Sequence, residues 1–516
     1  MRPRILSHAS LFLAGSSLAL VAGAADWLQF GHDPAHSGNN PDEHAINAAN
    51  VSRLVPQYAA PVFLGSMTDG APVYASGVTT AGGIRDLLFL FTTHQWYDGG
   101  AGDGTLFAID AATGAIVWSQ VTSGSSQHAS SSPVVDAAKQ YVYSFGLDGY
   151  VHKYATGDGS EVLSAGPAGW PAQVTLKPTD EKVAGSLAIA SSGAGFLQVV
   201  LNGYGGDVGD YQGHLVSIDL ASGARKVFNA LCSNVPTLLA LGGCPQLRGG
   251  IWGRGGATFD AATGRIYVAT GNGPFNAATG GFDWGDSVLA FAPDGSGSAA
   301  GMPRDSYTPT NYQQLESQDL DLGSSSLVIL PVPAGSAVAH LGLQAGKDAK
   351  ARLIDLDDMS GAAGPGHVGG ELQSLDLPYA FQIAQPAVWT DPADGSTWVF
   401  GSDIYAALPG MAGLQLQLDG SGRPDLVLRW TNSVAAASPV VANNVLYAAG
   451  ACDAGTCVIA REPTTGDVLW TSPPTGPVKW ASPIVVDGAV YVTDQYSQLW
   501  KFGLPDRVFG DGFDGT

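Results

Sequence analysis

The sequence is poor in charged residues, and basic residues are the scarcer of the two kinds. Charged residues make up 13% of the chain, and 23 Lys and Arg stand against 45 Asp and Glu, a formal net charge of −22. This acidity argues against a nucleic-acid backbone or an anionic membrane surface as partner, because both are negatively charged. Glycine, by contrast, is abundant at 70 residues, which is typical of many short strands and tight turns.

Cysteine is also scarce, with four residues in the chain. No Cys-x-x-Cys-His motif occurs, so the chain carries no c-type haem of its own, and no Gly-x-Ser-x-Gly motif indicates a hydrolase nucleophile. We predict the disulfides Cys232–Cys244 and Cys452–Cys457, the pairs closest in sequence, in an exported protein. A zinc site is the alternative, but no histidine stands at ligand spacing from these cysteines.

Long apolar runs are missing except near the N-terminus. There, a basic start precedes the apolar residues 11–21, and Ala22-Gly23-Ala24 or Ala25 offers a small-residue cleavage site. The run is too short and too rich in Gly and Ser for a stable transmembrane helix. We therefore predict a cleaved signal peptide over residues 1–25. The mature protein is expected to be soluble, in the periplasm or outside the cell, and not inserted in a membrane.

One recurring stretch organises the rest of the chain, and its clearest copy is GTLFAIDAATGAIVW at residues 104–118. Its period-2 alternation predicts two short strands, and Gly114 can take the positive φ that the turn between them requires. Variants follow roughly 40 to 75 residues apart, and such repetition predicts a β-propeller. The eight hairpins begin at Gly104, Gly149, Gly213, Asp286, Ala349, Gly413, Thr456 and Ser497.

A second type of strand pair lies between these hairpins. Runs such as Ser-Pro-Val-Val, each followed by a turn and a Val-Tyr-Val run, occur at residues 132–143, 438–447 and 482–492. We therefore predict an all-β fold, an eight-bladed β-propeller of four-stranded antiparallel blades over residues 26–506, with a flexible tail over 507–516. The segment 26–40 should introduce an N-terminal strand that pairs with the C-terminal segment 482–502, which would close the ring and leave no unpaired end blade.

Tryptophans at the ends of outer strands and long loops in the middle of the chain complete this prediction. We expect Trp118, Trp430 and Trp470 to pack between blades rather than to hold a cofactor. Binding residues usually lie on long loops of a closed scaffold. The long loops predicted here span residues 164–182, 229–252, 273–285, 301–322 and 361–385.

Several motifs in the middle of the chain resemble those of the quinoprotein alcohol dehydrogenases, a family built from pyrroloquinoline-quinone-type (PQQ-type) repeats. The segment 26–40 also resembles the opening of proteins with such repeats. The motifs are Ile251-Trp252-Gly253, Thr270-Gly271-Asn272-Gly273, Tyr307-Thr308-Pro309 followed by Asp319-Leu320-Asp321, Lys347-Asp348 before Leu353-Ile354-Asp355, and Gly205-Gly206-Asp207.

The resemblance implies eight blades with PQQ and a calcium or lanthanide ion on the propeller axis. It implies that Trp252 stacks beneath the quinone and that Lys347 faces the quinone oxygens. Asn272, Asp319, Asp321 and Asp207 would ligate the metal, and Asp319 or Asp321 would be the catalytic base. Loops that leave the inner strands on one face surround the mouth of the central channel. We therefore expect Trp252, Asn272, Asp319, Asp321 and Lys347 to converge near the axis.

The sequence departs from the family in two respects. It contains no pair of adjacent cysteines to cap the quinone, and it has no clear Glu among the metal ligands. We therefore expect no intact site for PQQ with calcium or a lanthanide. The favoured function is a monomeric binding or scaffold module for a protein, peptide or polysaccharide, which would bind on the loop-rich face. The alternative is a PQQ- and metal-dependent alcohol or sugar dehydrogenase.

Overall fold

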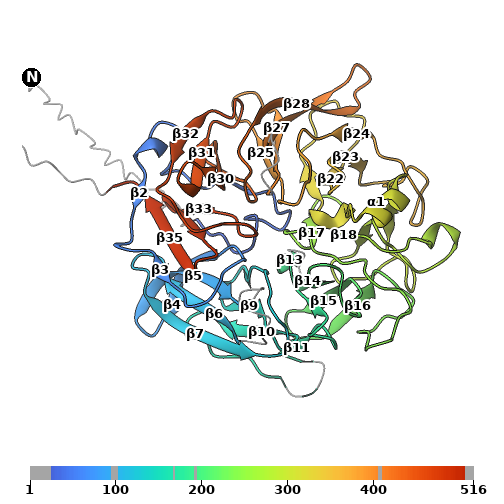
Figure 1. Cartoon of the computed structure of the whole chain (residues 1–516), viewed down its shortest axis with the longest axis horizontal. Helices are drawn as coiled ribbons and strands as arrows, with labels where there is room; N and C mark the ends of the chain where they lie inside the picture. Colours follow the sequence, from blue (N-terminus) through green and yellow to red (C-terminus); the bar gives the residue numbers. More distant parts are fainter. Residues whose placement is uncertain are drawn as a thin grey trace, which may run out of the picture.

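The computed structural model describes residues 25–93, 103–164, 166, 169–190, 195–404 and 410–505. The predicted signal segment up to residue 24 and the predicted tail from residue 507 lie outside the described residues. Eight β-sheets follow one another around a ring in sequence order, from blue to red in Figure 1. The predicted eight-bladed propeller of four-stranded antiparallel blades is confirmed.

The first four blades come from the first part of the chain. Blade 1 holds β4 (Val73–Thr80), β5 (Gly83–Thr92), β6 (Asp103–Asp110) and β7 (Ile116–Ser123). Blade 2 holds β8 (Val134–Val135), β9 (Tyr141–Phe145), β10 (Tyr150–Ala155) and β11 (Ala172–Gln173). Blade 3 holds β13 (Ala188–Ala190), β14 (Phe196–Gly203), β15 (His214–Asp219) and β16 (Arg225–Asn229), with β12 (Glu181–Lys182) also on β14. Blade 4 holds β17 (Thr258–Asp260), β18 (Arg265–Ala269), β19 (Val288–Phe291) and β20 (Asp305–Tyr307).

The next three blades repeat this arrangement. Blade 5 holds β21 (Val328–Leu330), β22 (Leu341–Ala345), β23 (Lys350–Asp355) and β24 (Gln373–Asp376). Blade 6 holds β25 (Ala387–Thr390), β26 (Thr397–Ser402), β27 (Met411–Leu418) and β28 (Pro424–Asn432). Blade 7 holds β29 (Val440–Ala442), β30 (Val445–Cys452), β31 (Gly455–Arg461) and β32 (Val468–Thr471). The short helices are η1 (Val51–Arg53), η2 (Ala277–Thr279), α1 (Tyr312–Gln318) and η3 (Leu322–Ser324).

Blade 8 closes the ring with strands from both ends of the described chain. The strands β33 (Ile484–Val486), β34 (Ala489–Thr493) and β35 (Gln498–Gly503) are joined by β2 (Val55–Pro56) and β3 (Val62–Phe63), which pair antiparallel with β35. The predicted closure of the ring by pairing of N- and C-terminal segments is therefore confirmed, and the closing strands β2 and β3 follow the segment 26–40. Within that segment, β1 (Asn39–Asn40) lies parallel to β29 of blade 7, and Trp27 bridges Tyr74 of blade 1.

The repeated sequence features explain how the blades form and adhere. The inner strands β8, β29 and β33 are buried throughout, as expected for apolar runs covered by blades on both sides. The three repeated tryptophans pack between blades as predicted. Trp118 Nε1 donates to Thr156 O at 2.8 Å, Trp430 Nε1 to Pro463 O at 2.8 Å and Trp470 Nε1 to Leu54 O at 3.2 Å, each acceptor lying in the next blade around the ring.

The two predicted disulfides, Cys232–Cys244 and Cys452–Cys457, are both present. The first closes a loop between blades 3 and 4, and the second joins β30 and β31 near the tip of their hairpin. No helix within the described residues is both long enough and apolar enough to cross a membrane.

Candidate functional site

The residues that the family motifs single out lie on loops of blades 3, 4 and 5. Trp252 stands between β16 and β17, and Asn272 follows β18. Asp319 ends α1 in the left-handed conformation, with φ of 54°, and Asp321 precedes η3. Lys347 follows β22. Each of these loops either follows a blade's second strand or leads to the next blade, so all of them open on one face of the ring.

The Lys347 ammonium brings four of these residues together. Its Nζ lies 2.5 Å from Asp321 Oδ2 and 3.1 Å from Asp319 Oδ1, and it stands 5.2 Å from the centre of the Trp252 ring. The Asp321 side chain is 5% exposed, whereas that of Asp319 is 66% exposed. Lys347 and Asp321 therefore form the buried half of this cluster, and Asp319 reaches it from solvent.

Asn272 extends the cluster toward blade 3. Its backbone N–H donates to Asp321 Oδ1 at 2.6 Å, and its Nδ2 donates to Asp207 Oδ2 at 2.8 Å. The Tyr211 hydroxyl donates to the other Asp207 oxygen at 2.5 Å. All six predicted cofactor and metal residues therefore belong to one connected group. A side chain at Gly271 would force Asp321 to shift, because a Cβ there would stand 2.5 Å from Asp321 Oδ1.

Burial and charge set the protonation states in this group. Burial raises the pKa of Asp321, so this carboxylate depends on the nearby ammonium to stay ionised. Burial opposes the charge of Lys347, but its pKa is raised because the attraction of Asp321 and Asp319 outweighs that cost. The pair is therefore a mutually dependent ion pair.

A second buried carboxyl group lies next to this pair and was not predicted from the sequence. Asp286 Oδ1 accepts the Leu322 N–H at 3.0 Å, and its Oδ2 is buried without a hydrogen-bond partner. Burial, reinforced by Asp321, raises the pKa of Asp286 well above its ordinary value. In the sequence this residue marks only the start of a repeat hairpin, so no local pattern indicates its proximity to Asp321.

Two further charged residues near Asp207 lie on the predicted long loops but belong to none of the family motifs. Arg248 Nε lies 3.6 Å from Asp207 Oδ2, and its Nη1 lies 3.5 Å from Glu316 Oε1. Arg248 and Glu316 belong to the loops 229–252 and 301–322. Loop length was the available signal, and it identified the region but not the partners.

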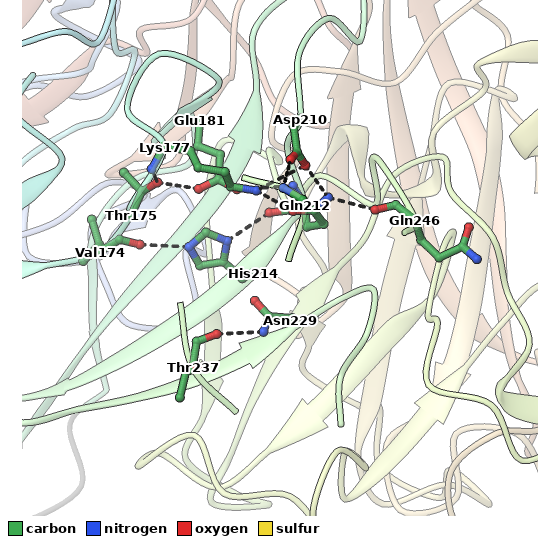
Figure 2. Close-up of polar contacts among 11 residues, drawn as sticks. Val174, Thr175, Lys177, Glu181, Asp210, Gln212, His214, Asn229, Thr237 and Gln246 are labelled. Atoms are coloured by element: carbon green, nitrogen blue, oxygen red, sulfur yellow. Dashed lines mark hydrogen bonds and ion pairs between the residues drawn. The ribbon is translucent and has the colours of Figure 1, made fainter. Parts of the chain in front are cut away.

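A buried polar network fixes the loop that carries Asp207 (Figure 2). Lys177 Nζ lies 3.0 Å from Glu181 Oε1, donates to Gln212 Oε1 at 2.5 Å, and lies 3.6 Å from Asp210 Oδ1. Gln212 Nε2 donates in turn to Gln246 O at 2.8 Å. The network joins the segment after β11, the turn before β15 and the loop of the first disulfide, so the backbone near Asp207 is held from three sides.

Arg254 joins the connections between blades. Its Nε donates to Trp480 O at 3.0 Å, and its Nη2 donates to Ser130 O at 2.5 Å and to Asp69 O at 3.3 Å. These carbonyls belong to the connections before blades 8, 2 and 1. A rigid, five-donor guanidinium suits this role because one group satisfies several carbonyls at once.

Lys182 lies near this arginine and faces a histidine. Its Nζ stands 2.8 Å from His128 Nε2. Burial lowers the pKa of Lys182 to about 8, and burial together with Lys182 lowers the pKa of His128 to about 3. His128 is therefore neutral at neutral pH, and its Nε2 can accept a hydrogen bond from the Lys182 ammonium.

Comparisons with known proteins identify the family. Residues 76–237 and 421–506 match a PQQ-repeat family model whose description is outer membrane protein assembly factor BamB. No curated protein sequence matches the chain. The structure is similar to a quinohemoprotein alcohol dehydrogenase from Pseudomonas putida HK5, with a TM-score of 0.62 and 14% identity over 93% of this chain and 80% of that one. It is also similar to a europium-containing methanol dehydrogenase, with a TM-score of 0.59 and 16% identity over 91% of this chain and 89% of that one.

The chain belongs to the PQQ-repeat β-propeller family. The two solved structures are so distant in sequence that their likeness shows the fold alone. Whether this PQQ-repeat propeller could hold the quinone and its metal has to be judged from its own side chains.

The residues of this PQQ-repeat propeller do not fit a metal ion and a quinone as they are arranged. Both carboxylate oxygens of Asp321 and both of Asp207 already accept hydrogen bonds or an ion pair within the protein. Lys347 places its ammonium over the Trp252 ring, the surface on which the quinone would stack. Among the residues that the structure describes, no group of three His, Cys, Asp or Glu side chains could hold a metal.

Proposed function

We propose that this propeller is an exported binding module that recognises a polypeptide partner on its loop-rich face. The observation that carries this proposal is the position of Lys347. Its ammonium neutralises Asp321 and Asp319 and covers Trp252, so the centre corresponding to the quinone site is internally satisfied. A buried pair of this kind favours one fixed loop arrangement, and because both oxygens of Asp321 are engaged, this carboxylate is not available as a base.

The surface proposed to bind the partner consists of four exposed apolar side chains on loops of the face that carries this centre, named here the loop patch. Leu241 is 70% exposed, Val208 58%, Leu247 46% and Phe282 36%. Their loops are held together, since Gly242 N donates to Asp210 Oδ2 at 2.5 Å, Ser233 N donates to Phe282 O at 2.9 Å, and the Cys232–Cys244 disulfide closes the longest of them. Exposed apolar residues grouped on pre-formed loops are typical of protein-binding surfaces.

The charge of the chain indicates the chemistry of the partner. Asp207, Asp210 and Glu316 lie on the same loops and are paired with Arg248 or Lys177, so the indication comes from the chain as a whole, which carries a formal charge of −22. A basic polypeptide segment with apolar side chains is therefore the favoured partner, because complementary charge speeds association. The family's description as an outer membrane protein assembly factor also supports a role in handling other proteins. The two disulfides support an oxidising compartment, the periplasm or the exterior, in which we expect a monomer.

Photo-crosslinking tests this proposal. A photoreactive amino acid at Leu241 should crosslink the exported chain to a specific polypeptide, whereas one at Ile84, an exposed position in blade 1, should not. A second substitution, Leu247→Asp, should abolish the Leu241 crosslink while leaving the unfolding transition unchanged. Equal crosslinking from both positions, or none from Leu241, would contradict the proposal.

The alternative is a PQQ-dependent dehydrogenase, and the observation that favours it is the meeting of Trp252, Asn272, Asp321 and Lys347 in one place. The similar structures are also named as alcohol and methanol dehydrogenases. Reconstitution with PQQ and calcium or a lanthanide separates the two functions. We expect neither a bound-quinone absorbance nor dye-linked alcohol oxidation. Either signal, if lost in Trp252→Ala, would establish the dehydrogenase instead.

A further inference from the structure

The segment of residues 26–43, named here the strap, follows the inner strands of the propeller around the ring. The first strand of each blade lies at one end of its sheet, and first strands of neighbouring blades contact one another, as β17 does β21 and β25 does β29. These are the innermost strands, so their free edges face the axis. The N–H groups on such an edge need partners from outside the blade.

The strap supplies these partners at one level of the ring. Six N–H groups from six different blades donate to it, and each belongs to the second residue of its strand, in β4, β8, β13, β17, β25 and β29. The acceptors follow one another along the strap in the same order as the blades follow around the ring. With distances of 2.7 to 3.0 Å, Tyr74 N–H donates to Trp27 O, Val135 to Leu28 O, Ile189 to Gln29 Oε1, Phe259 to Pro34 O, Val388 to Ser37 O and Val441 to Gly38 O.

The end of the strap continues this path to blade 8. Asn40 Nδ2 donates at 2.8 Å to the carbonyl oxygen of Val485, which is again the second residue of an inner strand, β33. Glu43 Oε2 then accepts the Gly488 N–H at 2.9 Å in the turn after that strand. The strap therefore contacts blades 1, 2, 3, 4, 6, 7 and 8 in that order.

Two buried side chains of the strap fill the axis at this level. Phe30 is 2% exposed and His36 is fully buried, with 6.2 Å between the centres of their rings. The His36 ring nitrogens lie 2.6 Å from Phe30 O and 3.0 Å from Ala257 O, so the ring is fixed both to the strap and to blade 4. The space left between these rings and blades 6, 7 and 8 is about 10 Å³, room for a single water molecule at most. The docked strap therefore closes the channel here.

The closure of the ring does not depend on the strap. The strands β2 and β3, which follow it in the chain, pair with β35 and complete blade 8. The strap itself takes one inner-strand N–H from each of six blades, whereas the four strands of a blade hold one another through complete ladders. Contacts spread so thinly over many blades are lost together when one chain segment leaves, and their loss leaves each blade's own ladders intact.

We propose that the strap is an internal polypeptide ligand of the ring, which undocks as one unit while the eight blades stay folded. Undocking frees the six inner-strand N–H groups and opens the axis at this level. An extended polypeptide is the ligand that fits, because carbonyl oxygens spaced along one backbone reach successive blades, whereas a compact small molecule does not. The strap is thus a closing device for the channel, separate from the loop patch.

Amide hydrogen exchange of the intact exported chain, read at single residues, tests this proposal. We expect the six N–H groups to share one protection factor, within about threefold, because one opening event frees all of them. Their protection should be roughly tenfold or more below that of second-strand amides such as Val142 and Val268, which open only when a blade unfolds. Six unrelated protection factors, or protection equal to that of the second strands, would overturn the proposal.

A substitution in the strap tests whether its contacts are lost together. Phe30→Ala should speed exchange about tenfold at Tyr74, Val135 and Ile189, although their N–H groups donate to other strap residues. Phe63→Ala, at an exposed aromatic residue of β3, is the matched control and should leave these rates unchanged. Acceleration confined to the immediate neighbours of Phe30 would show piecemeal opening and overturn the proposal. The exchange pattern of the unsubstituted chain remains a test even where this variant does not fold.

Cutting the chain after the strap gives a direct measure of undocking. A protease site inserted between the exposed residues Ala48 and Ala49 allows cleavage of the folded chain. We expect the cut segment to stay bound through gel filtration and to be replaced slowly by a fluorescent synthetic peptide of residues 26–48, while the circular dichroism of the ring is unchanged. The uncut chain should take up no peptide. Failure of the peptide to enter the cut chain, or its entry only as the ring unfolds, would overturn the proposal.

Discussion

The two halves of this ring are held together by different kinds of contact. Between blades 1 and 2, and between blades 6, 7 and 8, a tryptophan at the end of an outer strand donates to a carbonyl of the next blade. Blades 3 to 5 instead contain buried ion pairs. Those of Lys177 with Glu181 and of Arg352 with Asp348 each lie within one segment or hairpin, whereas Lys347 with Asp321 joins blade 5 to the connection from blade 4. A tryptophan that donates to a backbone carbonyl can repeat from blade to blade because every residue carries such an acceptor, whereas an ion pair requires a particular charged partner. The irregular half is therefore where a specific site could evolve.

Among the changes that test this comparison, removal of one tryptophan contact should have the largest effect on the free energy of unfolding. Trp118 is 9% exposed and lies 2.7 Å from the Cβ position of Gly159 in the next blade. Trp118→Ala should lower the free energy of unfolding by about 3–5 kcal/mol, since it leaves a cavity between blades. Trp252→Ala, in the irregular half and only partly buried, should cost about 1–2 kcal/mol. Chemical denaturation compares the two, and equal losses would show that the halves do not differ.

The two disulfides should also stabilise the protein by different amounts, and the larger contribution should come from the disulfide in the loop-rich part of the ring. Replacing Cys232 and Cys244 by Ala should cost about 3 kcal/mol, and replacing Cys452 and Cys457 by Ala about 2 kcal/mol, since the first pair closes the longer loop. Denaturant unfolding of the oxidised variants measures both losses. A smaller loss for the Cys232 and Cys244 variant would indicate that the hydrogen bonds of its loop already fix it.

The buried ion pair should show dependence of one partner on the other. Lys347→Met leaves Asp321 without its cation and should cost about 2–3 kcal/mol of unfolding free energy. Adding Asp321→Asn removes the unpaired charge and should restore most of this loss. A double-mutant cycle measures the coupling. If Lys347→Met alone were neutral, the two side chains would not be a dependent pair.

The smallest expected effect is an alkaline rise in stability that depends on Lys182. Its pKa is about 8 in the folded protein and 10.5 ordinarily. Between these values the unfolded chain binds more protons, so the free energy of unfolding rises with pH, by about 1–2 kcal/mol from pH 8 to pH 9.5. Below about pH 8 both states are protonated and the group adds no pH dependence. Unfolding of Lys182→Met over this range should show a flatter profile, and an unchanged profile would contradict the lowered pKa.

The sequence by itself determined the number of blades, the two disulfides and the tryptophan contacts. Each of these follows from a local sequence pattern. A hairpin consists of consecutive residues, and a disulfide between cysteines close in sequence can be predicted without knowing which distant segments meet. The hairpin repeat of residues 104–118 and its copies therefore counted the blades correctly. The motif residues around Trp252 also identified which loops meet, because the order of strands in a propeller is fixed by its topology.

Only the tertiary structure decided how the side chains of those loops are arranged. It identified the closing strands as β2 and β3, which pair antiparallel with β35. It placed the Lys347 ammonium between Asp319 and Asp321, and it buried Asp286 beside them. Such outcomes depend on distances of a few ångströms between residues far apart in the chain. Those distances cannot be predicted from the period of the repeats or from the residue types.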